Sequence, residues 1–484
     1  MISRFTHALS GFAAILACAL LLVPAPVCAR VQTQERLPGP VARALAAAGI
    51  PGSAVAVLVQ AADASSPRIS VNADRALDPA SVMKLVTTYA ALDLLGPAYT
   101  WKTEAWIEGR LHHGVLDGDL YLKGGGDPIL TYQRFWLLLA RLRAMGLTRI
   151  DGDLVQDRSL FDVGRAAPID DQPLRPYNVV PDPLLLDFEA LRLELLPDPA
   201  RDALAVLPEP LPDGLEIDNQ IQLAAGTCGD WQAGLRPELA EIGGQERLSL
   251  SGSYPRSCGE QTWRLAGLPH AQYVDGVFRD LWRQLGGSIG GGSREGEVPA
   301  DARLMVSLAS PPLAVVIRDI NKYSNNVMAR QLFLTLGAAA GHRPADEADA
   351  AAAVRAWLMS KRLDFPELVL DNGSGLSRRA RISAQSLARL LASAWRSPLM
   401  PEFVSSLPLA AEDGTMEKRL RFDAVAGQAH VKTGTLDGVK AIAGYVRDRA
   451  GKWQIVVFLV NHPEAARARA AQDALLQWVY ERGG

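Results

Sequence analysis

The stretch Pro79–Leu92, PASVMKLVTTYAAL, decides the fold. It predicts a turn followed by a helix that is apolar nearly all round, and such a helix belongs in a hydrophobic core. A hydroxyl stands at its start, at Ser81, and an amine follows one turn later at Lys84. Two structural explanations are open: Ser81 caps the helix, and the Lys84 ammonium reaches the surface on its long stem. The rest of the chain decides between these and a chemical role.

The composition and the N-terminus indicate an exported protein of several domains. The chain has 484 residues, and 50 Lys and Arg nearly balance 53 Asp and Glu, which argues against a nucleic-acid partner. The apolar run Gly11–Val23 follows basic residues and precedes small residues that end at Ala29. This layout predicts a signal peptide over residues 1–29, since the run is short for a membrane span. A retained N-terminal anchor is the alternative.

The cysteine content is also consistent with an exported protein. Removal of residues 1–29 leaves Cys228 and Cys258 as the two cysteines of the chain. An even pair in an oxidising compartment predicts one disulfide. Two unrelated buried thiols give the same pattern.

Strand and helix patterns at both ends of the chain enclose a long, mostly β segment. Residues 52–60 and 68–72 predict a strand pair, and short strands alternate with Gly, Pro and Asp turns from about 101 to 298. A hairpin around 449–452 follows near the C-terminus. The further helices expected are 134–144, about 272–286, 313–323, about 327–336 and about 464–480. This order predicts one α+β domain interrupted by a long insertion.

Two more polar clusters lie far from Ser81 in the sequence. Ser324-Asn325-Asn326 falls between two predicted helices, where such a cluster by itself is typical of a cap or turn. Lys432-Thr433-Gly434 falls on a predicted edge strand, where glycine would let a substrate backbone approach; a solvated strand end is the alternative. The order S-x-x-K, S-x-N, K-T-G is the signature of penicillin-recognising serine acyl-transferases.

On these motifs the chain resembles the class C low-molecular-mass penicillin-binding proteins, which are D-alanyl-D-alanine carboxypeptidases and endopeptidases of the penicillin-binding protein 4 type. The resemblance extends over essentially the whole mature chain. It includes the segments GDLYLKGGGDP (Gly118–Pro128), GDLVQDRSLF (Gly152–Phe161), DNGSGLSR (Asp371–Arg378) and EDGTMEKR (Glu412–Arg419). The long gap between Lys84 and Ser324 is its most specific feature, since in this family the gap holds extra domains.

The resemblance implies the architecture as well. We expect an α+β, DD-peptidase/β-lactamase-like domain, an antiparallel sheet flanked by helices, interrupted by a long, mostly β insertion that forms two extra domains. The implied boundaries are 36–103 and 300–484 for the catalytic domain, 104–190 and 263–299 for insertion domain II, and 191–262 for the nested insertion domain III.

The chemistry of such a site explains a lysine inside an apolar helix. A serine hydroxyl is a poor nucleophile until a base takes its proton. A lysine that is desolvated and lies near another cation has a lowered pKa and can be that base. Residues i and i+3 share one helix face, so Lys84 can reach Ser81, and Lys432 supplies the second cation.

By resemblance, each motif has a role in catalysis. Ser324 relays a proton to the leaving amine, and Asn326 orients both the substrate amide and the lysine. Thr433 binds the terminal carboxylate of the substrate, beside Gly434. The backbone N–H groups of Ser81 and Thr435 form the oxyanion hole. No metal or other cofactor is expected, and His430, next to the strand motif, is expected to be structural.

Two points stay open in the sequence. The stretch also fits Tyr323-x-Asn325, similar to the Tyr-x-Asn of class C β-lactamases, but the insertion and the glycine-rich segments favour Ser324-x-Asn326. In the family an acidic residue of the insertion binds the free amine of diaminopimelate. Asp170 and Asp171 lie in the corresponding stretch, and a solvated acidic turn is the alternative.

The sequence thus predicts a periplasmic, penicillin-sensitive serine DD-peptidase. It would cleave D-Ala-D-Ala stem peptides and the D-Ala–diaminopimelate cross-links of peptidoglycan through a Ser81 acyl-enzyme, with β-lactams as acylating inhibitors. A homodimer is left open. The alternatives are a serine β-lactamase, which would deacylate penicillin fast, and a non-catalytic wall-binding or penicillin-sensing module.

Overall fold

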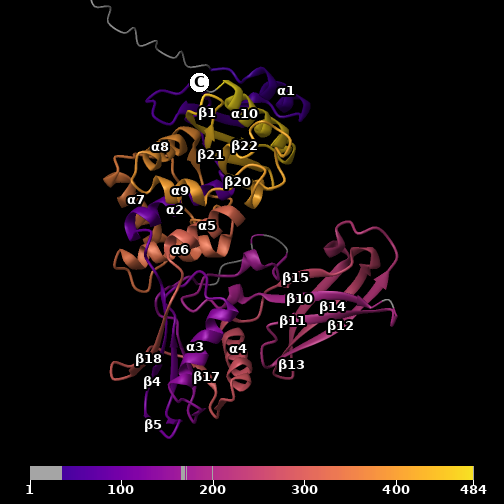
Figure 1. The fold of residues 1–484 in the computed structure, drawn as a ribbon, viewed down its shortest axis with the longest axis vertical. Helices are drawn as coiled ribbons and strands as arrows, with labels where there is room; N and C mark the ends of the chain where they lie inside the picture. Colours follow the sequence, from indigo (N-terminus) through magenta and orange to yellow (C-terminus); the bar gives the residue numbers. More distant parts are fainter. Residues whose placement is uncertain (1–34, 165–168, 170–171, 199, 483–484) are drawn as a thin grey trace, which may run out of the picture. The chain divides into compact units, whose positions relative to one another are not determined.

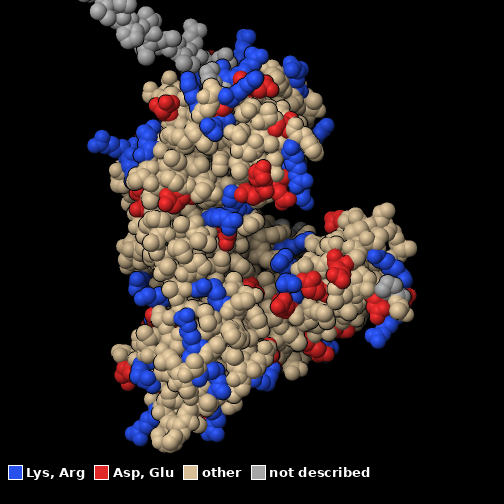
Figure 2. Space-filling model, in the orientation of Figure 1, with Lys and Arg blue, Asp and Glu red and all other residues tan. Residues whose placement is uncertain are grey.

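The computed structural model describes residues 35–164, 169, 172–198 and 200–482, so the predicted signal peptide, Asp170 and Asp171 lie outside the described residues. Within the described part, no helix has the length and apolar character needed to span a membrane. The fold is α+β, as predicted. Acidic and basic side chains are interspersed on the face shown in Figure 2, in keeping with the balanced composition.

Both ends of the chain build one antiparallel sheet (Figure 1). Its strand order is β2 (Ile69–Val71), β1 (Val55–Ala61), β22 (Trp453–Asn461), β21 (Val439–Arg447) and β20 (Ala429–Leu436). The predicted strand pair and C-terminal hairpin are therefore confirmed, and β20, which carries Lys432, lies at an edge. Strands β1, β21 and β22 are buried almost throughout, which requires helices on both faces of the sheet.

Two hydrophobic clusters cover those two faces. One face packs against α1 (Gly39–Ala47) and α10 (Arg469–Arg482). The other face packs against a larger group of helices, namely α2 (Lys84–Leu95), α5 (Leu313–Tyr323), α6 (Asn326–Ala339), α7 (Glu347–Ser360), α8 (Ala384–Trp395) and α9 (Met400–Ser406). A two-stranded sheet of β3 (Ala76–Leu77) and β19 (Ile382–Ser383) completes this part of the chain.

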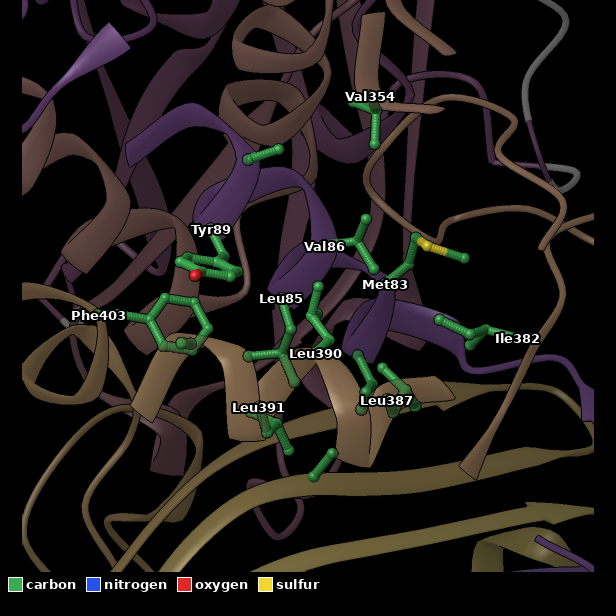
Figure 3. Close-up of a cluster of buried hydrophobic side chains, with 14 of the residues drawn as sticks. Met83, Leu85, Val86, Tyr89, Val354, Ile382, Leu387, Leu390, Leu391 and Phe403 are labelled. Atoms are coloured by element: carbon green, nitrogen blue, oxygen red, sulfur yellow. The ribbon is translucent and has the colours of Figure 1, made fainter. Parts of the chain in front are cut away.

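Helix α2 lies inside the larger cluster, as its apolar sequence predicts. All residues from Lys84 to Leu92 are buried. Leu85 and Val86 belong to the same buried cluster as Leu387, Leu390 and Leu391 of α8, and the Tyr89 ring lies 5.4 Å from the Phe403 ring of α9 (Figure 3). Each fully buried aliphatic or aromatic side chain contributes about 1.5–3 kcal/mol to folding. The helix that carries the lysine is therefore held from all sides.

The described residues of the insertion form four further sheets and two α-helices. The first sheet has the strand order β17 (Ser293–Glu295), β9 (Leu154–Asp157), β7 (Leu120–Lys123), β4 (Lys102–Ile107), β18 (Arg303–Ala309). The second has the order β16 (Ser288–Ile289), β8 (Arg149–Ile150), β6 (Val115–Asp117), β5 (Arg110–His112). The helices are α3 (Tyr132–Ala144) and α4 (His270–Gln284). The other two sheets are β11 (Ala203–Glu209), β10 (Leu191–Asp198), β15 (Gln261–Leu265), and β12 (Leu215–Ala224), β14 (Gln245–Pro255), β13 (Leu235–Ile242).

One hydrophobic cluster runs through all of these sheets, so the division into domains II and III stays a prediction. The predicted disulfide is present: Cys228 and Cys258 are joined, with their Cα atoms 4.7 Å apart.

Two helix boundaries differ from expectation. Helix α6 does not end at Gly337 but continues to Ala339, because Gly337 does not adopt the positive φ of a helix-ending glycine. Its missing Cβ instead admits α7, since a Cβ there would lie 3.0 Å from the backbone nitrogen of Ala350. The C-terminal helix begins at Arg469, and a separate 3₁₀ turn precedes it at Ala465–Ala468.

Candidate active site

Ser81 lies in a 3₁₀ turn, Ala80–Met83, that runs into α2. The turn is fixed to the end of β22, because Asp78 and Asn461 exchange two hydrogen bonds of 2.8 and 3.0 Å. Ala80 adopts a left-handed φ of 45°, a conformation that costs energy for a residue with a Cβ. The Ser81 side chain caps no backbone N–H, so the capping explanation is wrong.

The edge strand β20 lies directly against this turn. A Cβ on Gly434 would be 2.7 Å from the carbonyl oxygen of Pro79 and 3.1 Å from the backbone nitrogen of Ser81. We expected this glycine to admit a substrate backbone. The structure shows that Gly434 admits the turn of the chain that carries Ser81, which sets the position of Ser81 relative to the strand. The approach of a substrate backbone stays a prediction.

Lys84 does not reach the surface, so the surface explanation for its ammonium is wrong too. The side chain is fully buried. Its Nζ lies 3.0 Å from Ser81 Oγ and hydrogen-bonds to two carbonyl oxygens, Asn326 Oδ1 at 2.6 Å and Ser374 O at 2.7 Å. The hydroxyl of Ser81, the amide of Asn326 and the backbone of Ser374 are all uncharged. Burial, and then the positive charge of Lys432, hold the pKa of Lys84 well below its ordinary value of 10.5.

The three residues of the second motif lie in the turn between α5 and α6, and each has a different position and contact. Ser324 ends α5 in the left-handed region with φ of 58°, and Asn325 caps α6 by accepting a 3.0 Å hydrogen bond from the backbone of Met328. Asn326 is the first residue of α6 and points at Lys84. Tyr323 is 64 % exposed. The contacts thus favour Ser324-x-Asn326 over Tyr323-x-Asn325.

Lys432 is the second buried amine. Its Nζ donates to Ser324 Oγ at 2.8 Å and to the carbonyl oxygen of Thr433 at 2.7 Å. Burial lowers the pKa of Lys432 from 10.5 to about 7. The next two threonines on β20 are more accessible, and the Thr435 hydroxyl accepts a 2.9 Å hydrogen bond from Lys440. The three motifs therefore meet in one place.

The Asp371–Arg378 segment makes contacts in the site that its side chains did not predict. Besides the Ser374 carbonyl that Lys84 contacts, the Gly373 carbonyl accepts a 2.6 Å hydrogen bond from Thr87 of α2. Gly375 has φ of 75°, and a Cβ there would lie 1.9 Å from the Ala80 carbonyl oxygen. The glycines of this segment were its one visible signal, because a backbone carbonyl has no side-chain signature.

A comparison with protein families identifies the family of this chain. Over residues 37–482 the sequence matches the D-Ala-D-Ala carboxypeptidase 3 (S13) family. The chain belongs to this family. It is therefore a serine-type peptidase of the D-Ala-D-Ala carboxypeptidase class, as the motifs predicted.

Two relatives match over most of their length. A D-alanyl-D-alanine carboxypeptidase from Actinomadura sp. (strain R39) is 29 % identical over 432 residues, which cover 84 % of this chain and 77 % of the relative. The D-alanyl-D-alanine carboxypeptidase DacB of Haemophilus influenzae is 26 % identical over 392 residues, covering 79 % and 80 %.

Solved structures support the fold. The crystal structure of penicillin binding protein 4 (dacB) from Haemophilus influenzae superposes with a TM-score of 0.76 at 23 % identity, over 91 % of this chain and 99 % of the other. A predatory endopeptidase from Bdellovibrio bacteriovorus, solved with an immunity protein, gives a TM-score of 0.52 at 18 % identity, over 89 % and 93 %. The DD-peptidase-like fold expected from the sequence is confirmed.

Proposed function

We propose that Ser81 is the nucleophile of this family member, that Lys84 is its general base, and that the exported enzyme cleaves D-Ala-D-Ala stems and D-Ala–diaminopimelate cross-links of peptidoglycan. The observation that carries the proposal is the environment of the Lys84 amine: full burial, two carbonyl acceptors and one serine hydroxyl.

The donor count of that amine supports a basic role. A neutral amine has two N–H donors and one lone pair. The oxygens of Asn326 and Ser374 accept the two hydrogens, since neither oxygen can donate. The lone pair is then left for the third neighbour, the Ser81 hydroxyl, 3.0 Å away. In this arrangement Ser81 donates to Lys84, which is the geometry for removing the proton as the serine attacks a carbonyl carbon.

The second amine serves the leaving group and the substrate carboxylate. Lys432 holds the Ser324 hydroxyl at 2.8 Å, so Ser324 can pass the proton taken from Ser81 to the departing nitrogen. The charge of Lys432 attracts the terminal carboxylate, which the Thr433 hydroxyl would bind. The backbone N–H groups of Ser81 and Thr435 stabilise the oxyanion. Water then attacks the acyl-enzyme and releases the shortened peptide.

Relatives and neighbours support the substrate and inhibitor classes. The Haemophilus influenzae neighbour is named a penicillin binding protein and was also solved with a β-lactam, and the Bdellovibrio bacteriovorus neighbour is named an endopeptidase. We therefore propose β-lactams as acylating inhibitors and cross-links as substrates. Export to the periplasm rests on the N-terminal layout, and residues 1–29 lie outside the described residues. The proposal that Asp170 or Asp171 binds diaminopimelate also awaits experiment.

Penicillin labelling and peptide turnover test this function directly. We expect the purified protein to gain the mass of one penicillin, to release D-alanine from an N-acylated D-Ala-D-Ala peptide and to convert cross-linked muropeptide dimers to monomers. The measurement is intact mass spectrometry with burst kinetics, followed by chromatography of the muropeptides. A penicillin adduct that hydrolyses many times per second would favour a β-lactamase instead.

The pH dependence should reveal the two amines. The active form carries one proton on the pair, with Lys84 neutral and Lys432 charged. Lowering the pH protonates Lys84, and raising it past about 7 removes the proton of Lys432. We expect kcat/KM for D-alanine release to be bell-shaped, falling up to about tenfold per pH unit on each side. The alkaline limb of the kcat profile should lie at higher pH than that of kcat/KM, because a bound substrate carboxylate favours the ammonium form of Lys432.

The alkaline limb has its own control. In Lys432→Gln the remaining activity should lose this limb, whereas Lys452→Gln, a change at an exposed lysine, should keep it. An alkaline limb that persists unchanged in Lys432→Gln would show that another group titrates there.

A further inference from the structure

The segment Glu412–Arg419 has no part in the mechanism above, yet it lies between two motifs of the site. Asp413 forms a 2.6 Å ion pair with Lys322, which lies two residues before Ser324. The Lys322 side chain is only 8 % exposed. Gly414 has φ of 56°, and a Cβ there would lie 2.4 Å from the Lys322 carbonyl oxygen. The segment is thus fixed against the end of α5.

The other end of the segment is fixed as well. Arg419, 7 % exposed in its side chain, pairs with Asp473 of α10, with Nε donating to Oδ1 at 3.0 Å. Between the two anchors stands Thr415, which is exposed to solvent. Its hydroxyl accepts a 2.7 Å hydrogen bond from the hydroxyl of Thr433 on β20. The fold therefore holds a second hydroxyl at hydrogen-bond distance from the side chain proposed to bind the substrate carboxylate.

We propose that Thr415 is a positioning residue for recognition of the terminal carboxylate, acting through Thr433; this rests on the proposed function. A carboxylate only accepts hydrogen bonds, so the Thr433 hydrogen must turn from Thr415 to the substrate when it binds. Thr415 then donates to the freed Thr433 oxygen. The result is a chain from Thr415 to Thr433 to the carboxylate, in which each hydrogen bond polarises the next.

Two substrates separate this role from a structural one. The first is an N-acylated D-Ala-D-Ala peptide, which ends in the carboxylate. The second is an N-acyl-D-alanine p-nitrophenyl ester, which forms the same acyl-enzyme without a carboxylate. For Thr415→Val we expect KM for the peptide to rise about 5- to 10-fold with kcat changed less than about twofold. The kcat/KM for the ester should stay at the wild-type value.

A double-mutant cycle tests the connection through Thr433. Adding Thr415→Val to Thr433→Val should raise the peptide KM by less than about twofold further, because the chain is already broken. Thr415→Ser, which keeps the hydroxyl, should restore most of the wild-type KM. Thr262→Val is the matched control, since that hydroxyl bonds to Glu194 in the insertion.

Each result has a defined meaning. An unchanged peptide KM in Thr415→Val, an equal loss on both substrates, or additive effects in the cycle would overturn the inference. Failure of the proposed function would look different. The wild-type protein itself would then neither gain the penicillin mass nor release D-alanine.

Discussion

Ser81→Ala is expected to abolish both the penicillin adduct and the cleavage of D-Ala-D-Ala peptides. The side chain that would form the acyl-enzyme is removed, while Lys84 keeps the carbonyl oxygens of Asn326 and Ser374 as partners. Losses of a serine nucleophile in comparable enzymes reach about 10⁶-fold in kcat, and any remainder comes from substrate binding and the oxyanion hole. The measurement is intact mass after incubation with penicillin, with D-alanine release followed in parallel.

Ser405→Ala gives the matched control. Ser405 is exposed on α9, where its hydroxyl bonds to the Glu402 carbonyl oxygen at 3.2 Å, so its loss should leave labelling and turnover at wild-type values. If Ser81→Ala still gains the penicillin mass, peptide mapping will locate the true acceptor, and Ser324 is the first residue to examine because its hydroxyl contacts Lys432. A persisting adduct would refute the nucleophile assignment.

The side-chain motifs in the sequence were enough to predict which residues meet in the candidate site. Ser81 and Lys84 are three residues apart, and the fold confirms that they touch. The motifs at Ser324 and Lys432 could be placed in an inter-helix turn and an edge strand, because apolar periodicity and helix starts are local signals. The disulfide also followed from a count of cysteines.

Contacts made by the backbone could not be predicted in the same way. The Ser374 carbonyl that completes the Lys84 environment is 290 residues away in sequence, and any residue type supplies a carbonyl. The sequence predicts a close backbone approach at Gly434, but it does not predict that the turn at Ser81 packs there, because it does not say which backbone comes near a glycine. The continuation of α6 through Gly337 has the same origin in long-range packing.

The two replacements Lys84→Arg and Lys84→Met should each reduce acylation about as far as loss of a general base allows, by about 10²- to 10⁴-fold. Arginine keeps a positive charge, but its guanidinium does not give up a proton in proteins, so it cannot serve as the base. Methionine has a similar length and carries no amine. Pre-steady-state labelling with a reporter penicillin measures the acylation rate of each variant, and Lys361→Met, at a lysine that instead pairs with Asp93, is the control.

A second property should separate a neutral base from a structural cation at this position. The pKa of Lys84 is lower in the folded protein than its ordinary value of 10.5. Between the folded and the ordinary pKa the unfolded state binds more protons, so the wild-type free energy of unfolding rises with pH in that window. Lys84→Met lacks this contribution, which amounts to at most about 1.4 kcal/mol per pH unit. Denaturant unfolding at pH 7 and pH 9 should therefore show wild-type stability gaining on that of Lys84→Met. If the two proteins keep a constant difference, Lys84 is charged at both pH values, and a charged lysine cannot accept the Ser81 proton.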